Sequence, residues 1–235
     1  MGLRTWPQGR TITVNRTTAY VTATGVALPE QPATPAGEAR GALPAPVVRD
    51  LRGRAGGSPH TLLFGAHDLV VVTGLPGSGK STLMRRAVRG ARVDSQDTRD
   101  RWDRRMPRLL PYAAYRPLVR LSHYAGLRRA LRAGGGVVVH DCGTQAWVRR
   151  WLAREARRRG ARLHLLLLDV APQQALDGQR ERGRGVSRYA FLRHRAASDR
   201  LLRAVERGEP PAGCGSAVLI DRDAANALRH IGFAG

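Results

Sequence analysis

The chain of 235 residues has little cysteine, few aromatic residues, no long apolar run and almost no lysine. Its two cysteines, Cys142 and Cys214, are too few for a disulfide framework or an all-cysteine zinc site, so we predict no zinc. No apolar run approaches the ~20 residues that a membrane-spanning helix needs. The N-terminus has no apolar signal core. These absences predict a cytoplasmic protein with reduced thiols and no membrane partner.

Positive charge is in large excess, with a formal net charge of +22. Such an excess is typical of proteins that bind nucleic acid. However, aromatic residues make up only 5% of the chain, and no basic stretch is interleaved with stacking aromatics. Ala, Gly, Pro and Arg are abundant along the whole chain, as a GC-rich coding bias produces. A dedicated nucleic-acid partner is therefore not favoured, and any protein partner stays unidentified.

The single lysine, Lys80, lies in Gly74-Leu75-Pro76-Gly77-Ser78-Gly79-Lys80-Ser81, while the other 39 of the 40 Lys+Arg residues are arginines. This segment fits the phosphate-binding pattern G-x-x-x-x-G-K-[ST] at every fixed position. The run Leu69–Val72 before it indicates a buried strand, and Ser81–Val88 after it indicates a helix. Strand, glycine loop and helix are the context in which this motif binds a nucleotide. The predicted nucleotide-binding residues are Gly74, Leu75, Pro76, Gly77, Ser78, Gly79, Lys80, Ser81 and Thr82.

Each residue type in the loop has a physical role. The glycines permit a tight loop whose backbone N–H groups surround phosphate oxygens, and the helix that follows presents its positive end to them. Lys80 supplies a compact ammonium to the β- and γ-phosphates, where the planar guanidinium of arginine is a poor substitute. Ser81 supplies a hydroxyl to Mg²⁺.

Composition divides the chain at about residue 59. Residues 1–59 are rich in Pro, Ala and Gly, which predicts a flexible N-terminal segment, although Thr11–Val14 is a candidate strand. Residues 60–235 alternate apolar runs with helical patterns, which predicts one α/β domain with a five-stranded parallel sheet covered on both faces. The expected strands are Leu69–Thr73, Ala91–Val93, Val137–Val139, Leu163–Leu168 and Ala217–Ile220. The expected helices include Arg116–Arg132, Thr144–Arg159, one from Pro172, Ser187–Arg207 and a short one after Asp223.

Acidic residues follow several of these strands, where ligands bind in parallel sheets. Asp141 follows a strand of valines and is a candidate for holding Mg²⁺ near Ser81; a capping or loop aspartate is the alternative. Asp94 and Asp97 follow the second strand, and either could accept the proton of an attacking hydroxyl. Arg99 could bind an anionic group of the acceptor. The alternative is a capping box with solvated charges, since Ser95 and Asp97 could also start the helix.

The segment Arg180–Arg188 joins two helices and is rich in arginine and glycine. Such a segment can close over ATP as a lid, with Arg180 and Arg184 neutralising charge on the transferring phosphoryl group. The alternative is a solvated loop without a function, in a chain that is rich in arginine throughout. Ala153–Arg159 is expected to be a solvated helix face. Trp147 and Trp151 lie four residues apart and are expected to pack against the sheet.

The loop, the acid–arginine pair, the Asp141 strand and the arginine-rich lid resemble those of the P-loop kinase-type ATPases. This group includes polynucleotide kinase, zeta toxin, gluconate kinase and chloramphenicol phosphotransferase. The resemblance covers residues 60–235 and implies a three-layer fold with strand order 2-3-1-4-5, with ATP and Mg²⁺ as cofactors. In this group the acid commonly stands three residues before the arginine. Gln96 occupies that position here, so Asp94 and Asp97 both remain candidates. The composition is similar to that of actinobacterial proteins.

The leading hypothesis is a phosphotransferase that moves the ATP γ-phosphate to a hydroxyl of a small molecule or a nucleic-acid end. A second hypothesis is a nucleotide-responsive ATPase or switch that acts through a protein or nucleic-acid partner. A third is a nucleic-acid-binding ATPase. The sequence does not identify the acceptor.

Overall fold

The computed structural model describes residues 45–54, 57–107, 109–141, 145–181, 183 and 185–234, together with the backbone of residues 26–27. Several sequence predictions lie outside these residues. They are the candidate strand Thr11–Val14, the start of the predicted helix at Thr144, and the lid residue Arg184.

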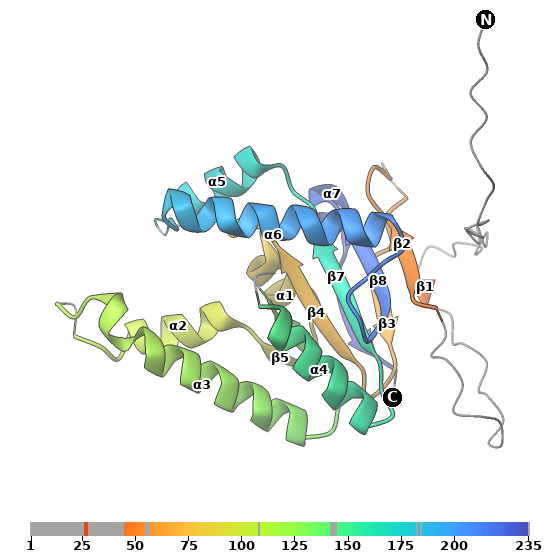
Figure 1. Ribbon diagram of the computed structural model, residues 1–235, viewed down its shortest axis with the longest axis horizontal. Helices are drawn as coiled ribbons and strands as arrows, with labels where there is room; N and C mark the ends of the chain where they lie inside the picture. Colours follow the sequence, from red (N-terminus) through yellow and green to blue (C-terminus); the bar gives the residue numbers. More distant parts are fainter. Residues whose placement is uncertain are drawn as a thin grey trace, which may run out of the picture.

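Six parallel strands form the main sheet of the described residues (Figure 1). The strands are β2 (Val47–Asp50), β4 (Leu69–Gly74), β5 (Ala91–Val93), β6 (Val137–His140), β7 (Leu163–Leu168) and β8 (Cys214–Ile220). They lie in the order β2-β8-β7-β4-β6-β5. The five strands expected from the sequence therefore have the predicted order 2-3-1-4-5, and β2 is a sixth strand beside β8. Every residue of the central strands β4 and β7 is buried.

The sixth strand comes from the segment 1–59, which composition assigned to a flexible tail. Val47–Asp50 pair with Ser216–Leu219 of β8 in parallel register. The prediction is wrong for these four residues, because β8 offers a row of backbone groups that a short valine-containing strand can satisfy. The turn after β2 is fixed by Arg52, whose guanidinium contacts Asp50, Asp169 and Glu206 at 2.6–2.9 Å.

Helices cover both faces of the sheet, as the α/β pattern predicts. One face packs against α3 (Tyr112–Arg132), α4 (Ala146–Arg158) and α6 (Arg188–Glu206), with Val71 and Leu165 among the strand residues in this core. The other face packs against α1 (Lys80–Ala87) and α7 (Arg222–Ala227), with Val70 and Leu166 in the core. Neighbouring strand residues thus point into opposite cores, because side chains alternate along a strand. No helix in the described part of the chain is both long and apolar enough to cross a membrane.

A second, three-stranded sheet in the order β1-β3-β9 lies next to the α1 and α7 layer (Figure 1). It consists of β1 (Val26–Ala27), β3 (Thr61–Phe64) and β9 (His230–Phe233), all parallel. The sequence analysis missed this sheet, because its strands are short and are separated by most of the chain. Leu62, Phe64 and Ile231 bury their side chains in the same core as α1. The two remaining helices, α2 (Ser95–Asp103) and α5 (Pro172–Arg180), follow the carboxyl ends of β5 and β7.

Three buried polar side chains form a hydrogen-bonded chain at the amino edge of the main sheet. Asp68 precedes β4, His164 lies in β7 and Ser216 lies in β8. The Asp68 carboxylate accepts a hydrogen bond from His164 Nε2 at 2.8 Å, and His164 Nδ1 lies 2.7 Å from the Ser216 hydroxyl. Because a carboxylate only accepts, Nε2 carries a proton. All three side chains are buried at the amino edge of the sheet, away from the glycine loop.

Candidate nucleotide site

The glycine loop connects β4 to α1 at the carboxyl edge of the sheet. Gly74 and Gly77 have φ angles of +143° and +87°, which side-chain-bearing residues rarely adopt. A Cβ atom at Gly74 would also collide with the Leu168 carbonyl of β7, and one at Gly77 would collide with the Ala175 carbonyl of α5. Glycine is therefore required at both positions by conformation and by close packing.

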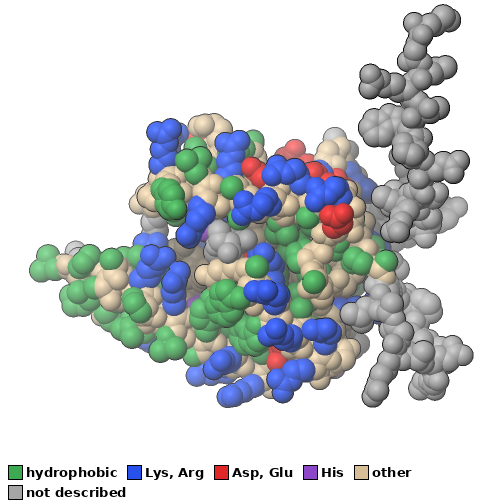
Figure 2. Space-filling view, viewed as in Figure 1, with side chains coloured by type: hydrophobic (Ala, Val, Ile, Leu, Met, Phe, Trp, Pro, Cys, Tyr) green, Lys and Arg blue, Asp and Glu red, His purple; other side chains and the backbone are tan. Residues whose placement is uncertain are grey.

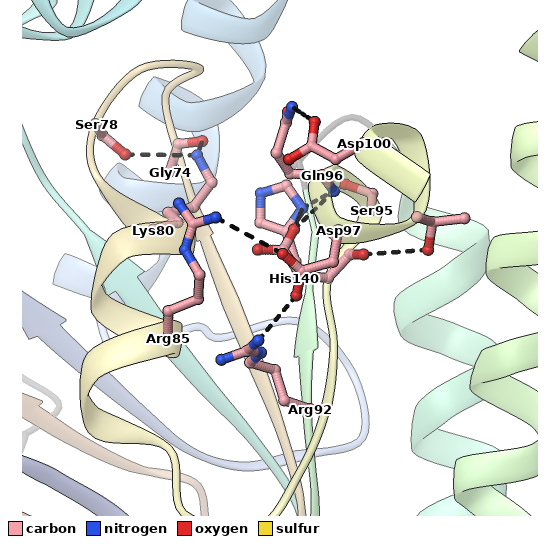
Figure 3. A network of polar contacts seen from close by, with 12 residues as sticks. Gly74, Ser78, Lys80, Arg85, Arg92, Ser95, Gln96, Asp97, Asp100 and His140 are labelled. Atoms are coloured by element: carbon pink, nitrogen blue, oxygen red, sulfur yellow. Dashed lines mark hydrogen bonds and ion pairs between the residues drawn. The ribbon is translucent and has the colours of Figure 1, made fainter. Parts of the chain in front are cut away.

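Lys80 begins α1 and folds back over the loop. Its Nζ donates hydrogen bonds to the carbonyl oxygens of Gly74 at 2.9 Å and Leu75 at 2.6 Å, and lies 3.4 Å from the Ser78 hydroxyl (Figure 3). The side chain is buried, so the ammonium sits inside the loop rather than in solvent. Ser81 is also buried, whereas Thr82 is exposed on α1. Of these two predicted ligands, Ser81 has the more suitable location.

Asp94 follows β5 and lies level with His140 of β6, because Val93 pairs with Val139. Its Oδ1 accepts a hydrogen bond from the backbone N–H of Gln96 at 2.9 Å and so caps α2. Its Oδ2 is buried and has no hydrogen-bond partner among the described residues. The helix is therefore capped by Asp94 and not, as the capping alternative had it, by Ser95 or Asp97. Capping accounts for one oxygen of the Asp94 carboxylate and leaves the other for a ligand.

Asp97 has a different environment. One of its carboxylate oxygens lies 3.0 Å from Arg92 Nη2, and the other lies 3.7 Å from Arg85 Nη1 (Figure 3). Its side chain is 30% exposed, whereas that of Asp94 is fully buried. Two arginines thus already neutralise Asp97, and only Asp94 combines burial with an unpaired oxygen.

His140 lies close to both Ser95 and Asp94. Its Nδ1 lies 2.7 Å from the Ser95 hydroxyl and 3.5 Å from Asp94 Oδ1. Burial first, and then the positive charge of Lys80, lower the pKa of His140 to about 4, although Asp94 acts in the opposite direction. The imidazole is therefore neutral near pH 7. The sequence analysis gave His140 no role; its position level with Asp94 could have been found from the strand ends.

Arg99 has two neighbours on α2 and α3, and its side chain is 33% exposed. Its guanidinium carbon lies 4.0 Å from the centre of the Tyr112 ring, and its Nε lies 3.6 Å from the Asp103 carboxylate. Tyr115 donates a hydrogen bond to the same carboxylate at 2.6 Å. The predicted anion-binding arginine is thus part of the contact between α2 and α3.

Asp141 follows β6, and its backbone N–H bonds to Val72 of β4. Its Oδ2 forms a buried ion pair with Arg149 of α4 at 2.6 Å. The described residues contain no group of three or more acidic, histidine or cysteine side chains that could hold a metal. Ser81 and Asp141 supply hard oxygens of the kind that Mg²⁺ takes, and Mg²⁺ commonly completes its shell with water and phosphate. The donor set therefore fits Mg²⁺ bound together with a nucleotide.

The predicted lid is connected to the loop by Gln179 of α5. This buried side chain donates from Nε2 to the Pro76 carbonyl at 3.0 Å and accepts from the Val186 N–H at 2.9 Å. The sequence analysis gave Gln179 no role of its own, because no residue pattern marks it. Arg180 is exposed and pairs with Asp177 at 2.9 Å, and Arg184 lies outside the described residues.

Comparison with known proteins identifies the family. The model of the AAA domain family matches residues 69–207, which are more than half of the chain. The chain belongs to the AAA domain family. The matched region contains the loop, Asp94 and Asp141, and it confirms the predicted P-loop kinase-type, nucleotide-binding character. No curated protein matches the sequence of this AAA domain protein.

Two solved structures are similar to the AAA domain protein at low identity. The tunicamycin resistance protein of Deinococcus radiodurans is 16% identical, with 57% of this chain and 80% of that chain covered and a TM-score of 0.37. A candidate kinase from Chloroflexus aurantiacus is 15% identical, with 66% and 88% covered and a TM-score of 0.43.

Proposed function

We propose that the protein transfers the γ-phosphoryl group of Mg·ATP to a hydroxyl group of a small molecule or of a nucleic-acid end. The observation that carries this proposal is the unpaired Oδ2 of Asp94, a buried carboxylate oxygen at the strand end two strands from the phosphate loop. Membership of a kinase-like family supports it. A protein that only bound ATP would not need such a carboxylate.

The loop residues would hold the nucleotide. Backbone N–H groups of the loop and of the first turn of α1 would bind phosphate oxygens, and Lys80 would move its ammonium from the Gly74 and Leu75 carbonyls to the β- and γ-phosphates. Ser81 and the Oδ1 side of Asp141 would hold Mg²⁺, directly or through water. Bound Mg²⁺ would neutralise charge on the phosphates.

Asp94 is the proposed general base, in preference to Asp97. The acceptor hydroxyl would give its proton to Asp94 Oδ2 while its oxygen bonds to the γ-phosphorus, and the bond from that phosphorus to the β–γ bridging oxygen would break to release ADP. Neutral His140 would hold the residues around Asp94 in place through its hydrogen bond with Ser95. Arg99 would position the acceptor indirectly, through the α2–α3 contact.

The lid would complete the site. Arg180 and Arg184 are the candidates for stabilising charge on the transferring group, and the exposure of Arg180 leaves its guanidinium able to turn toward a bound nucleotide. The ion pair with Asp177 is on the surface, so breaking it costs little.

The test uses ATP labelled at the γ-phosphate, Mg²⁺ and the purified full chain. A metabolite extract and, separately, oligonucleotides with free 5′-hydroxyls serve as acceptors, with Lys80→Ala as the control. We expect label on an acceptor with the wild type only. Equal turnover by Lys80→Ala would overturn the assignment of the loop.

A nucleotide-responsive switch is the second candidate, favoured by one observation. Gln179 links the loop to the segment after α5, so that a change at the loop would reach this segment. ATP binding without a labelled acceptor, together with a partner that binds differently in ATP and ADP, would favour this function over phosphotransfer.

A further inference from the structure

A groove runs between α3 and α4 on the outer side of the sheet, along the two helices rather than at the phosphate loop. Its volume is about 940 Å³, and a second hollow of about 500 Å³ continues it, sharing Arg128, Arg132 and Trp151. Figure 2 shows hydrophobic side chains flanked by basic ones over these two helices. The residues that line the larger part are Leu121, Tyr124, Ala125, Arg128, Arg129, Arg132, Trp147, Arg150, Trp151 and Arg154.

An aromatic platform stands at one end of this α3–α4 groove. Trp147 is 50% exposed, and its ring centre lies 5.2 Å from that of Tyr124. The Tyr124 hydroxyl donates a hydrogen bond to Gln145 at 2.6 Å, which fixes the ring that supports Trp147. The prediction that Trp147 packs against the sheet is therefore wrong, whereas Trp151 does pack against the core. An exposed indole held in place by a second ring offers a ready stacking surface.

The charge of the groove specifies what it can bind. Exposed arginines line it from both helices, and the acidic residue in its lining, Glu155, is already paired with Arg159 at 3.1 Å. An occupant must therefore be anionic. A second copy of this chain, with a net charge of +22, would bring more positive charge to a positive surface.

We propose that the α3–α4 groove binds single-stranded nucleic acid, with bases stacked on the Trp147–Tyr124 platform and phosphates paired with the arginines along both helices. Aromatic faces beside a basic track are how single strands are bound without sequence preference. A duplex fits less well, because its bases are already stacked and cannot reach the platform. The sequence analysis did not favour nucleic acid, since the aromatics and arginines meet only when α3 and α4 pack together. The proposal does not depend on phosphotransfer at the loop.

Binding is measured without ATP, so that its result is independent of the proposed enzyme activity. Fluorescence anisotropy of a labelled 20-nucleotide oligo-dT is recorded at several salt concentrations. We expect Trp147→Ala to weaken binding at least about fivefold and Trp147→Phe to restore most of it. Replacing Arg128 and Arg154 together by Ser should weaken binding further and make the dependence of log K on log salt less steep by about 1.4, at roughly 0.7 per phosphate contact.

A strongly basic protein binds nucleic acid weakly at any surface, so charge-matched controls decide the result. The double variant Arg200→Ser/Arg203→Ser removes the same charge from the exposed side of α6. Equal weakening by both double variants, an unchanged affinity of Trp147→Ala, or equally tight binding of a duplex would each overturn the proposal. So would an oligo-glutamate peptide that binds more tightly than the oligonucleotide and depends on Trp147. Circular dichroism melts of every variant check that it is folded.

Discussion

Gln179 of α5 donates its side-chain amide to the Pro76 carbonyl of the phosphate loop at 3.0 Å. The other end of the same amide accepts a hydrogen bond from Val186, beyond α5. A Cβ atom at neighbouring Gly178 would lie only 2.5 Å from the Gly77 carbonyl, so the helix and the loop are in close backbone contact. The side chain of Gln179 thereby connects the loop to the segment proposed as a lid.

Replacing Gln179 by Leu should weaken ATP binding about tenfold and lower stability by about 1–3 kcal/mol, because two partly buried hydrogen bonds, to the Pro76 carbonyl and from the Val186 N–H, are lost. Calorimetric titration with ATP and a thermal melt measure the two effects. Gln173→Leu is the matched control, since Gln173 lies on the exposed side of the same helix. Equal effects of the two substitutions would contradict the coupling.

The two acids after β5 should differ as bases. Asp94→Asn should lower kcat by about 10²-fold or more while ATP still binds, because a positioned general base contributes about 10²–10⁴-fold. Asp97→Asn should lower kcat less than tenfold, since Asp97 is already paired with Arg85 and Arg92. Steady-state kinetics with the acceptor found by the labelling experiment measure both. A larger loss in Asp97→Asn than in Asp94→Asn would show that the assignment is reversed.

Acid should destabilise the fold through His140. The folded-state pKa of about 4 lies below the value of about 6.5 expected for an unfolded histidine, so the unfolded chain binds the proton more tightly. This contribution to stability is complete above about pH 6.5 and is lost as pH falls toward 4, at a cost on the order of 3 kcal/mol. Urea unfolding between pH 7 and 4 should show a flatter pH dependence for His140→Asn.

The control for this experiment is His67→Asn, because His67 is exposed. The pH dependence of the free energy of unfolding should be flatter in His140→Asn than in this control variant. If the free energy of unfolding of His140→Asn depended on pH as steeply as that of the wild type, groups other than His140 would cause the acid sensitivity.

Cys214 should be unreactive in the folded protein. Burial raises the pKa of its thiol to about 11, so almost no thiolate forms near pH 8. In a Cys142→Ser variant, a thiol reagent should label nothing over hours under native conditions and one thiol rapidly in denaturant. Fast labelling of the native variant would contradict the buried position of Cys214 in β8.

The sequence was sufficient for the parts of the fold and site that local patterns encode. The loop pattern around Lys80 and the apolar runs of β4 to β8 each lie in one short stretch, so their periodicity and spacing could be recognised directly. Helix starts were less accurate. The helix expected from Arg116 begins at Tyr112, because its first turn packs Tyr112 and Tyr115 against Arg99 and Asp103 of α2.

Contacts between distant residues could not be predicted. Asp68 and Ser216 meet at His164, 96 and 52 positions away in the sequence, and nothing in the sequence around either one signals the other. The same applies to Gln179 and Pro76. From the sequence, Asp94 and Asp97 were equally good candidates for the general base. They can be distinguished only in the structure, where Arg85 and Arg92 lie next to Asp97.

The strand β2 has a practical consequence for the solubility of shortened forms. Val47–Asp50 cover one side of β8, whose Ala217–Ile220 are almost completely buried and apolar. A chain that begins at residue 60 would keep the whole nucleotide site and yet leave that strand open, as a template on which another molecule could add a strand. Such a chain should self-associate as its concentration rises, whereas one that retains residues 45–59 should not.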